Sequence, residues 1–177
     1  MHQDNRREVP MGLLDKLKGT RPPKEGVAPV SVDELRSTLV GLTRDSAPWE
    51  VRDGADEGCD LVAEWRIVDA QWYGIFFAYG LSKVFRVKMK FDESDHEVRN
   101  VDEQAEVDWR DGVPVISKSW SRGQINEIES GKAIGFTEEG QLGEVYNYKF
   151  RSSEIKDPLR DAVTEHGWGW KAVSFKL

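Results

Sequence analysis

A strict alternation of apolar and basic residues between positions 85 and 91 constrains the fold more than any other feature of this sequence. Successive side chains of a β-strand point to opposite faces, so the pattern predicts a strand with one buried face and one cationic face. The apolar positions are Phe85, Val87, Met89 and Phe91, and the basic positions are Arg86, Lys88 and Lys90. A polar turn at 92–95 follows, and a second segment runs from His96 to Arg110. We therefore expect a long antiparallel hairpin at the centre of the fold.

The second segment of this hairpin alternates less regularly. Its apolar positions Ala105, Val107 and Trp109 alternate with the acidic positions Glu106 and Asp108, which we expect on the outer face, paired with the basic strand. Val98 and Val101 differ in parity and cannot share one face of a regular strand. The sequence therefore predicts a β-bulge or a sharp bend between residues 99 and 101.

Three helices are expected around this hairpin. The sequence from Ser31 to Glu34 matches a capping box, and apolar residues at helical spacing continue the helix to about Thr43. A second helix is expected over 69–80, with an aspartate to cap its start and a glycine after its end. The pair Asp157 and Pro158 predicts the start of a third helix, which ends near Gly167.

The remaining apolar runs are short and separated by turn residues, as in antiparallel strands. They lie at 49–52, 61–67, 113–120, 125–128, 133–138, 145–150 and 168–175. The order helix, two strands, helix, about five strands, helix, strand predicts an α+β fold. Its sheet is expected to be a curled, mainly antiparallel meander of about seven or eight strands, packed by two or three short helices.

The chain divides into a tail and a body. Residues 1–30 are expected to be a flexible tail with a proline-rich linker, and residues 31–177 a single domain. Within the tail, Leu13, Leu14 and Leu17 fall on one side of a short basic segment, which either docks weakly on a membrane or partner or folds back on the domain. The start of translation is open between Met1 and Met11.

Charge and composition limit the partners. The tail carries six Lys or Arg against four Asp or Glu, which leaves 19 against 28 in the body, a net charge of −9. A body of this sign repels phosphate backbones, so no nucleic-acid partner is expected, and a basic protein partner is favoured. A single cysteine, no secretory signal and no apolar run long enough for a transmembrane helix predict a soluble, cytoplasmic protein.

The sequence contains no familiar catalytic or cofactor-binding motif, and no cofactor or metal is expected. His96 lies in an acidic turn whose spacing is that of a solvated hairpin rather than of a calcium loop. The carboxylates of Asp102, Glu103, Glu106 and Asp108 form a candidate acid–base group, for which surface pairing with the basic strand is the preferred interpretation. Cys59 has acidic neighbours, which disfavour a reactive thiolate.

Aromatic residues are the remaining candidates for function. Tryptophan and tyrosine are enriched in ligand pockets and interface hot spots, although they also fill cores. The candidate ligand or interface residues are Trp65, Trp72, Phe76, Trp109, Trp168 and Trp170. The last two flank Gly169, and alternation would place both rings on one face of a strand.

These features favour a non-catalytic binding or interaction protein, although an enzyme is not excluded. The alternative is a small-ligand-binding domain, enzymatic or not, with an apolar pocket lined by Trp65, Trp72, Phe76 and Trp109. A hydrolase using the carboxylates is the third hypothesis. The protein is expected to be a monomer or a homodimer, since the face with Trp168 and Trp170 or an exposed edge strand would allow two copies to pair.

Overall fold

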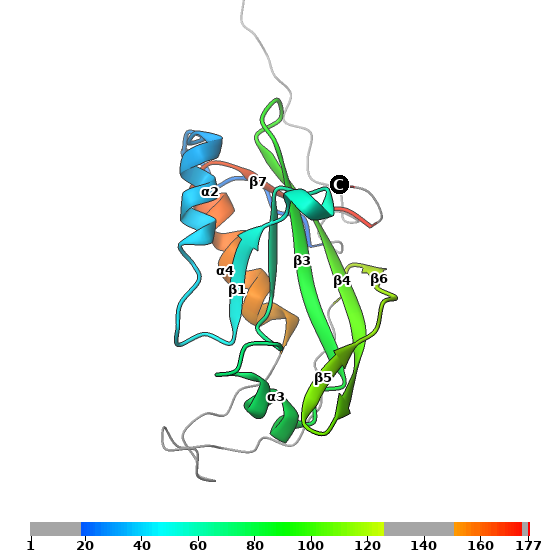
Figure 1. Cartoon of the computed structure of the whole chain (residues 1–177). Coiled ribbons are helices and arrows are strands. Elements are labelled where there is room, and N and C mark those ends of the chain that lie inside the picture. The colour runs from blue at the N-terminus through cyan, green and yellow to red at the C-terminus, as the bar shows by residue number, and fades with distance from the viewer. Residues whose placement is uncertain (1–18, 126–150, 175–176) are drawn as a thin grey trace, which may run out of the picture.

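The computed structural model describes residues 19–125, 151–174 and 177, and confirms the predicted α+β class (Figure 1). Within these residues, one largely antiparallel sheet of seven strands packs with three α-helices. The strands are β1 (Trp49–Asp53), β2 (Leu61–Trp65), β3 (Lys83–Asp92), β4 (Glu97–Arg110), β5 (Val113–Ile116), β6 (Ser121–Gly123) and β7 (Gly169–Ala172). The helices are α2 (Val32–Val40), α3 (Tyr73–Tyr79) and α4 (Ser152–Glu165), and a short 3-10 turn, η1, spans Ala55–Glu57.

The predicted hairpin of β3 and β4 forms the centre of the sheet. Its register is unbroken from the pair Lys83 and Glu106 to the pair Asp92 and Glu97. This register excludes a bulge, which was one of the two alternatives expected at residues 99–101. Val98 and Val101 lie on opposite faces of a regular strand. The face that bears Val98 continues with the buried polar residues Asn100 and Asp102 instead of with apolar residues.

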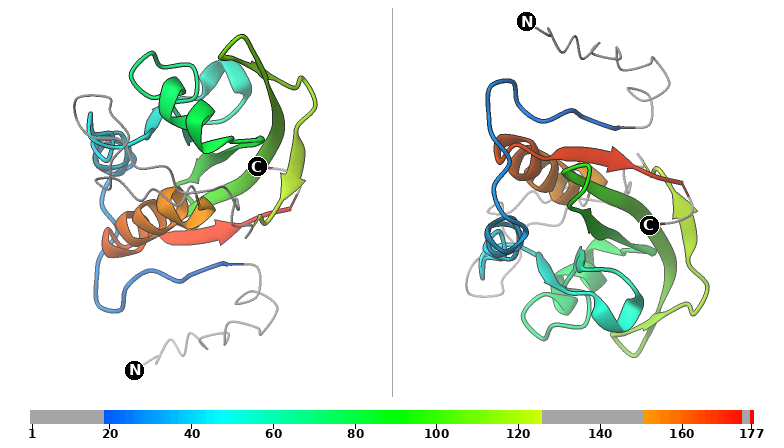
Figure 2. Two further views of the ribbon diagram at one scale, coloured as in Figure 1. Left: turned by 90° about the horizontal axis from the view of Figure 1, so that it is seen from below. Right: turned by 90° about the horizontal axis from the view of Figure 1, so that it is seen from above.

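β4 also organises the opposite half of the sheet. While β3 pairs along one edge of β4, the other edge pairs first with β7, which is parallel, and then with β6 and β5, which are antiparallel. Figure 2 shows how strongly the long β3–β4 hairpin curves past these shorter strands. The free edge of β1, at the far end of the sheet, is closed by Thr43, whose hydroxyl accepts from Val51 N at 2.9 Å and donates to Val51 O at 3.3 Å.

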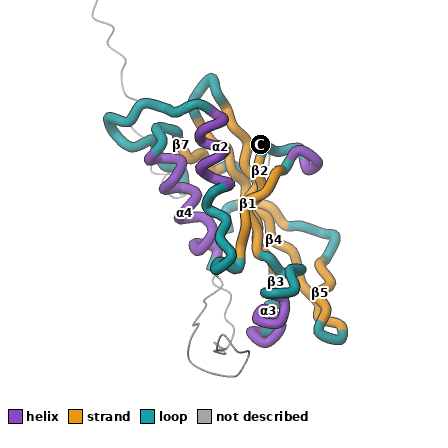
Figure 3. Tube along the Cα trace, turned by 60° about the vertical axis from the view of Figure 1, so that its left-hand side comes forward, coloured by secondary structure: helices purple, strands orange, loops and turns teal. Residues whose placement is uncertain are grey.

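Helices α2 and α4 lie side by side against the sheet, and α3 lies near the β5 end (Figure 3). The predicted cap of α2 is confirmed, because Ser31 Oγ accepts from Glu34 N at 3.2 Å. Gly80 ends α3 with the left-handed backbone that was expected. The start predicted for α4 was wrong: the helix begins at Ser152, and Pro158 lies inside it, where the missing N–H removes only one intrahelical bond.

The proline-rich segment assigned to a linker runs beside α4 and β7 in the described part of the chain (Figure 2). Arg21 forms a two-way backbone bridge with Trp170, with both N–O distances at 2.8 Å. Further along, Val30 N donates to His166 O, and Val30 O accepts from the Trp168 indole at 2.9 Å. These bonds attach residues 21–30 to the body of the domain.

Several predictions fall on parts of the chain outside the described residues. These are the docking segment with Leu13, Leu14 and Leu17, and the strands expected at 126–128, 133–138 and 145–150. In the portion that is described, no helix has the length and apolar character needed to cross a membrane.

Candidate functional site

Five of the six aromatic residues predicted as ligand or interface candidates lie in the hydrophobic core. The buried residues are Trp65, Trp72, Phe76, Trp168 and Trp170. Trp65 packs edge-on against Phe76, at 6.1 Å between ring centroids, and the Trp168 ring meets Phe91 in the same way. Trp168 and Trp170 are each only 1% exposed, so the chain itself covers both rings.

Trp109 is the sixth candidate and is only partly buried. Its indole N–H donates to Leu81 O at 2.7 Å, and its ring meets Phe77 of α3 edge-on at 5.3 Å. Phe77 is 49% exposed and Tyr73 is 40% exposed, and their spacing of one helical turn places both on the same side of α3. We call Tyr73, Phe77 and Trp109 the α3 surface. Of these three residues, Trp109 was predicted as a candidate from the sequence, and Tyr73 and Phe77 were not.

The cationic face predicted for β3 is covered at Arg86 and Lys88, whereas Lys90 is exposed. Arg86 and Lys88 are nearly buried, and both contact Glu103 of β4, which is completely buried, at 2.6 and 3.5 Å. Arg122 of β6 reaches the other oxygen of Glu103 at 2.7 Å. Arg86, Lys88, Glu103 and Arg122 thus form a charged row across three strands. Glu103 pairs with the basic strand as expected, but inside the protein rather than at its surface.

Glu57 of η1 forms further ion pairs with this charged row. Its carboxylate lies 2.9 Å from Arg86, 3.1 Å from Lys88 and 2.6 Å from Arg52. Burial disfavours the ionised carboxylate, but hydrogen bonds from Arg52 and Lys88 and the charge of Arg86 outweigh that cost and lower the pKa of Glu57 to about 2. Burial is likewise outweighed at Glu103, whose pKa is lowered chiefly by the bond from Arg86. Both groups are therefore held as structural anions.

Asp102 is also completely buried but meets a different partner. One carboxylate oxygen accepts from Lys156 Nζ of α4 at 2.6 Å and from Ile125 N at 2.8 Å. The other oxygen has no hydrogen-bond partner among the described residues, and the same is true of Asn100 Oδ1. Burial raises the pKa of Asp102 in spite of Lys156.

The four carboxylates of β4 do not form an acid–base pair around one cleft. Consecutive residues of a strand face opposite ways, so Asp102 and Glu103 are separated by the sheet itself. Glu106 and Asp108 are exposed, as predicted, but the pairing expected between them and the basic strand was wrong. The register places Glu106 opposite Lys83, so Glu106 and Asp108 lie on the other face of the hairpin from Arg86 and Lys88. The arrangement suits structural ion pairs better than hydrolysis.

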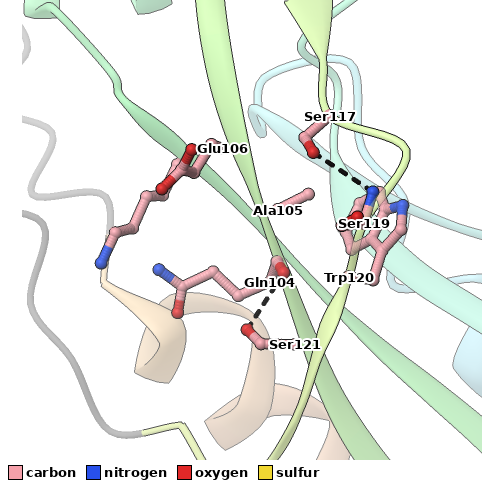
Figure 4. Close-up of a pocket in the computed structure, with 8 residues that line it drawn as sticks. Gln104, Ala105, Glu106, Ser117, Ser119, Trp120 and Ser121 are labelled. Carbon is pink, nitrogen blue, oxygen red and sulfur yellow. Dashed lines mark hydrogen bonds between the residues drawn. The ribbon is translucent and has the colours of Figure 1, made fainter.

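A groove of about 630 Å³ opens beside β4, where the chain passes from β5 to β6 (Figure 4). Its lining residues are Lys83, Gln104, Ala105, Glu106, Ser117, Ser119, Trp120 and Ser121. Six of the eight lining residues carry hydroxyl, amide or charged groups, and none of the aromatic residues predicted to line an apolar pocket contributes to the groove. The Ser-rich connection between β5 and β6 has no spacing from which the groove could have been predicted.

Cys59 and His96, the other residues considered for chemistry, pack against neighbouring parts of the fold. Cys59 is buried, its pKa is raised by that burial, and its Sγ lies 3.5 Å from Gly54 O. His96 lies in the β3–β4 turn and packs edge-on against Trp168 at 5.3 Å. In the described ranges, no cluster of three or more His, Cys, Asp or Glu is placed to hold a metal ion.

Comparison of the chain with protein-family models, curated proteins and solved structures gives no match.

Proposed function

We propose that this chain is a non-catalytic binding protein that recognises a protein partner through the α3 surface. The observation that carries the proposal is the pair of exposed aromatic side chains, Tyr73 and Phe77, on one side of α3. Exposed aromatic rings supported by a packed neighbour are typical of interface hot spots. Phe77 has such support, because its ring rests on Trp109, which is itself fixed by its bond to Leu81 O.

The charge of the body favours a partner with basic residues around an apolar contact. Its net charge of −9 after residue 30 would speed encounter with a protein of opposite sign. A cytoplasmic location is part of the same proposal and is supported by the single cysteine, which is a free and buried thiol.

Site-specific photocrosslinking in the cells that produce the protein tests this proposal. A photoreactive phenylalanine analogue at position 77 is expected to give a discrete crosslinked protein, and Tyr73→Ser in the same chain is expected to abolish it. The matched control is the same analogue at Val40 of α2, which is 41% exposed and distant in sequence from the α3 surface. Equal crosslinking from positions 77 and 40, or none from position 77, contradicts the proposal.

A further inference from the structure

We propose that the groove between β4 and the β5–β6 connection binds a small, neutral, hydroxyl-rich molecule of the sugar or polyol class. This site is separate from the α3 surface and does not depend on the function proposed for it.

The groove exists because the edge chain bulges away from β4. Ser117 N donates to Glu106 O at 2.8 Å, and Ser121 pairs with Gln104. Between these two points β4 advances by two residues, from 106 to 104, whereas the β5–β6 connection advances by four, from 117 to 121. The extra residues loop out opposite Ala105, whose small side chain leaves room. Bulges of this kind often re-aim side chains beside binding sites.

The walls of the groove are ordered by bonds of their own. Trp120 is held by the Arg86 guanidinium, which lies 3.8 Å from its ring centroid and is itself fixed by Glu103. Ser117 Oγ accepts from Ser119 N at 3.2 Å, and Ser121 Oγ donates to Gln104 O at 3.2 Å. A site whose walls are already held loses less conformational entropy when a ligand binds.

The chemistry of the lining selects the class of ligand. Figure 4 shows the residues gathered around Ala105, with Gln104 and Glu106 on one flank and Ser117, Ser119 and Trp120 on the other. Serine hydroxyls and the glutamine amide each offer hydrogen-bond donors and acceptors, and a ligand hydroxyl can both accept from the donors and donate to the acceptors. Glu106 and Lys83 are cross-strand neighbours of opposite charge, so their charges offset and give an ionic ligand no net attraction. Trp120 adds apolar surface for the carbon face of a ring.

The size of the groove is compatible with this class. Its volume of about 630 Å³ lies within the range of small-molecule sites, roughly 300 to 1,000 Å³. The polar character also continues inward along the same face of β4. Asp102 follows Gln104 on that face, and Asn100 follows Asp102.

Titration of the full-length chain with uncharged probes tests the inference. D-glucose, maltose, myo-inositol and sorbitol are added to about 10 mM, at which a ligand with a Kd near 1 mM would be about nine-tenths bound. Binding is followed by calorimetry and by saturation-transfer NMR. We expect at least one probe to bind, and glucose 6-phosphate and glucosamine, the charged relatives of glucose, to bind at least tenfold more weakly than the neutral sugar.

Variants of the groove locate the binding. Gln104→Leu is expected to weaken it at least tenfold, and Asp108→Asn, on the same face of the same strand but outside the groove, is expected to leave it unchanged. Should Gln104→Leu fail to fold, Ser119→Tyr serves instead, because it fills the groove from an exposed position. The inference is overturned if no neutral probe binds, if the charged relatives bind as tightly, or if neither Gln104→Leu nor Ser119→Tyr weakens binding.

Discussion

Asp102 and Glu103 are consecutive in β4, and both side chains are completely buried on opposite faces of the sheet. Asp102 meets one cation, Lys156, and its pKa is raised, whereas Glu103 meets Arg86, Lys88 and Arg122, and its pKa is lowered. The number of cations around each carboxylate decides the direction of the shift, because burial opposes ionisation of both. Two neighbours of similar chemistry therefore make opposite contributions to the pH dependence of stability.

Glu103→Gln should strongly destabilise the protein. The substitution removes the completely buried one of the two anions, Glu103 and Glu57, that neutralise Arg86 and Lys88, and breaking a buried ion pair from one side costs about 3 kcal/mol or more. Glu106→Gln makes the same chemical change at an exposed position of the same strand and should stay within about 0.5 kcal/mol of the wild type. Urea denaturation of both variants checks this, and equal free energies of unfolding would contradict a structural role for Glu103.

Asp102→Asn should change the pH dependence of stability in the opposite direction from a typical salt-bridged carboxylate. Because the folded-state pKa of Asp102 is raised, the wild type loses stability as pH rises from the unfolded value of about 3.9 through the folded pKa. The variant lacks this loss. The free energy of unfolding of the wild type minus that of Asp102→Asn should therefore fall across that window and then level off, and a rising difference would contradict the raised pKa.

Glu57→Gln should show the opposite dependence in acid. The pKa of Glu57 in the folded protein is about 2, below its unfolded value, so its ionised form stabilises the protein above an unfolded pKa of about 4.3. This contribution is lost as pH falls from there toward 2. The advantage of the wild type over Glu57→Gln should shrink through that range in acid denaturation. An advantage that is constant between pH 5 and 2 would show that the Arg52, Arg86 and Lys88 contacts do not hold the anion.

Gly167→Ala should detach the N-terminal segment from the end of α4. Gly167 has a φ of +78°, and an added Cβ would lie 2.5 Å from the Ala28 backbone, so left-handed strain combines with a clash, for a cost of about 3 kcal/mol. Gly26→Ala is the matched control, because Gly26 has a φ of +77° but nothing within 4 Å of the added atom, which leaves a strain of roughly 1 kcal/mol. Thermal melts and hydrogen exchange at Val30 N compare the two. Equal losses of stability in the two variants would mean that the Ala28 backbone shifts away from the added Cβ without an energetic cost.

The sequence predicts those elements whose signals are local. The alternation at 85–91, the capping box at Ser31 and the glycine at position 80 each correspond to an observed strand, cap or helix end. The start of α4 was misplaced because Pro158 was interpreted as a first-turn residue. The burial of Asn100 and Asp102 also escaped prediction, since it depends on partners remote in sequence, such as Lys156.

The candidate site was less predictable than the fold. Residue type identifies Trp168 and Trp170 as important but cannot distinguish a core position from a ligand wall, because both environments favour large rings with a polar atom. The contact of Trp109 with Phe77 connects a predicted residue to an exposed surface. The groove depends on a bulge between β5 and β6, which follows from pairing with β4 rather than from any local pattern.

Thr43→Val should open the free edge of β1. The hydroxyl of Thr43 bonds both backbone groups of Val51, and valine keeps the shape while leaving those groups without their partner, at a cost of about 1 to 2 kcal/mol. Thr43→Ser retains the hydroxyl and should cost less than half as much. Since unpaired strand edges promote pairing between chains, Thr43→Val should also increase self-association in light scattering at high concentration. If Thr43→Val is as stable and as monodisperse as Thr43→Ser, the hydroxyl does not protect this edge.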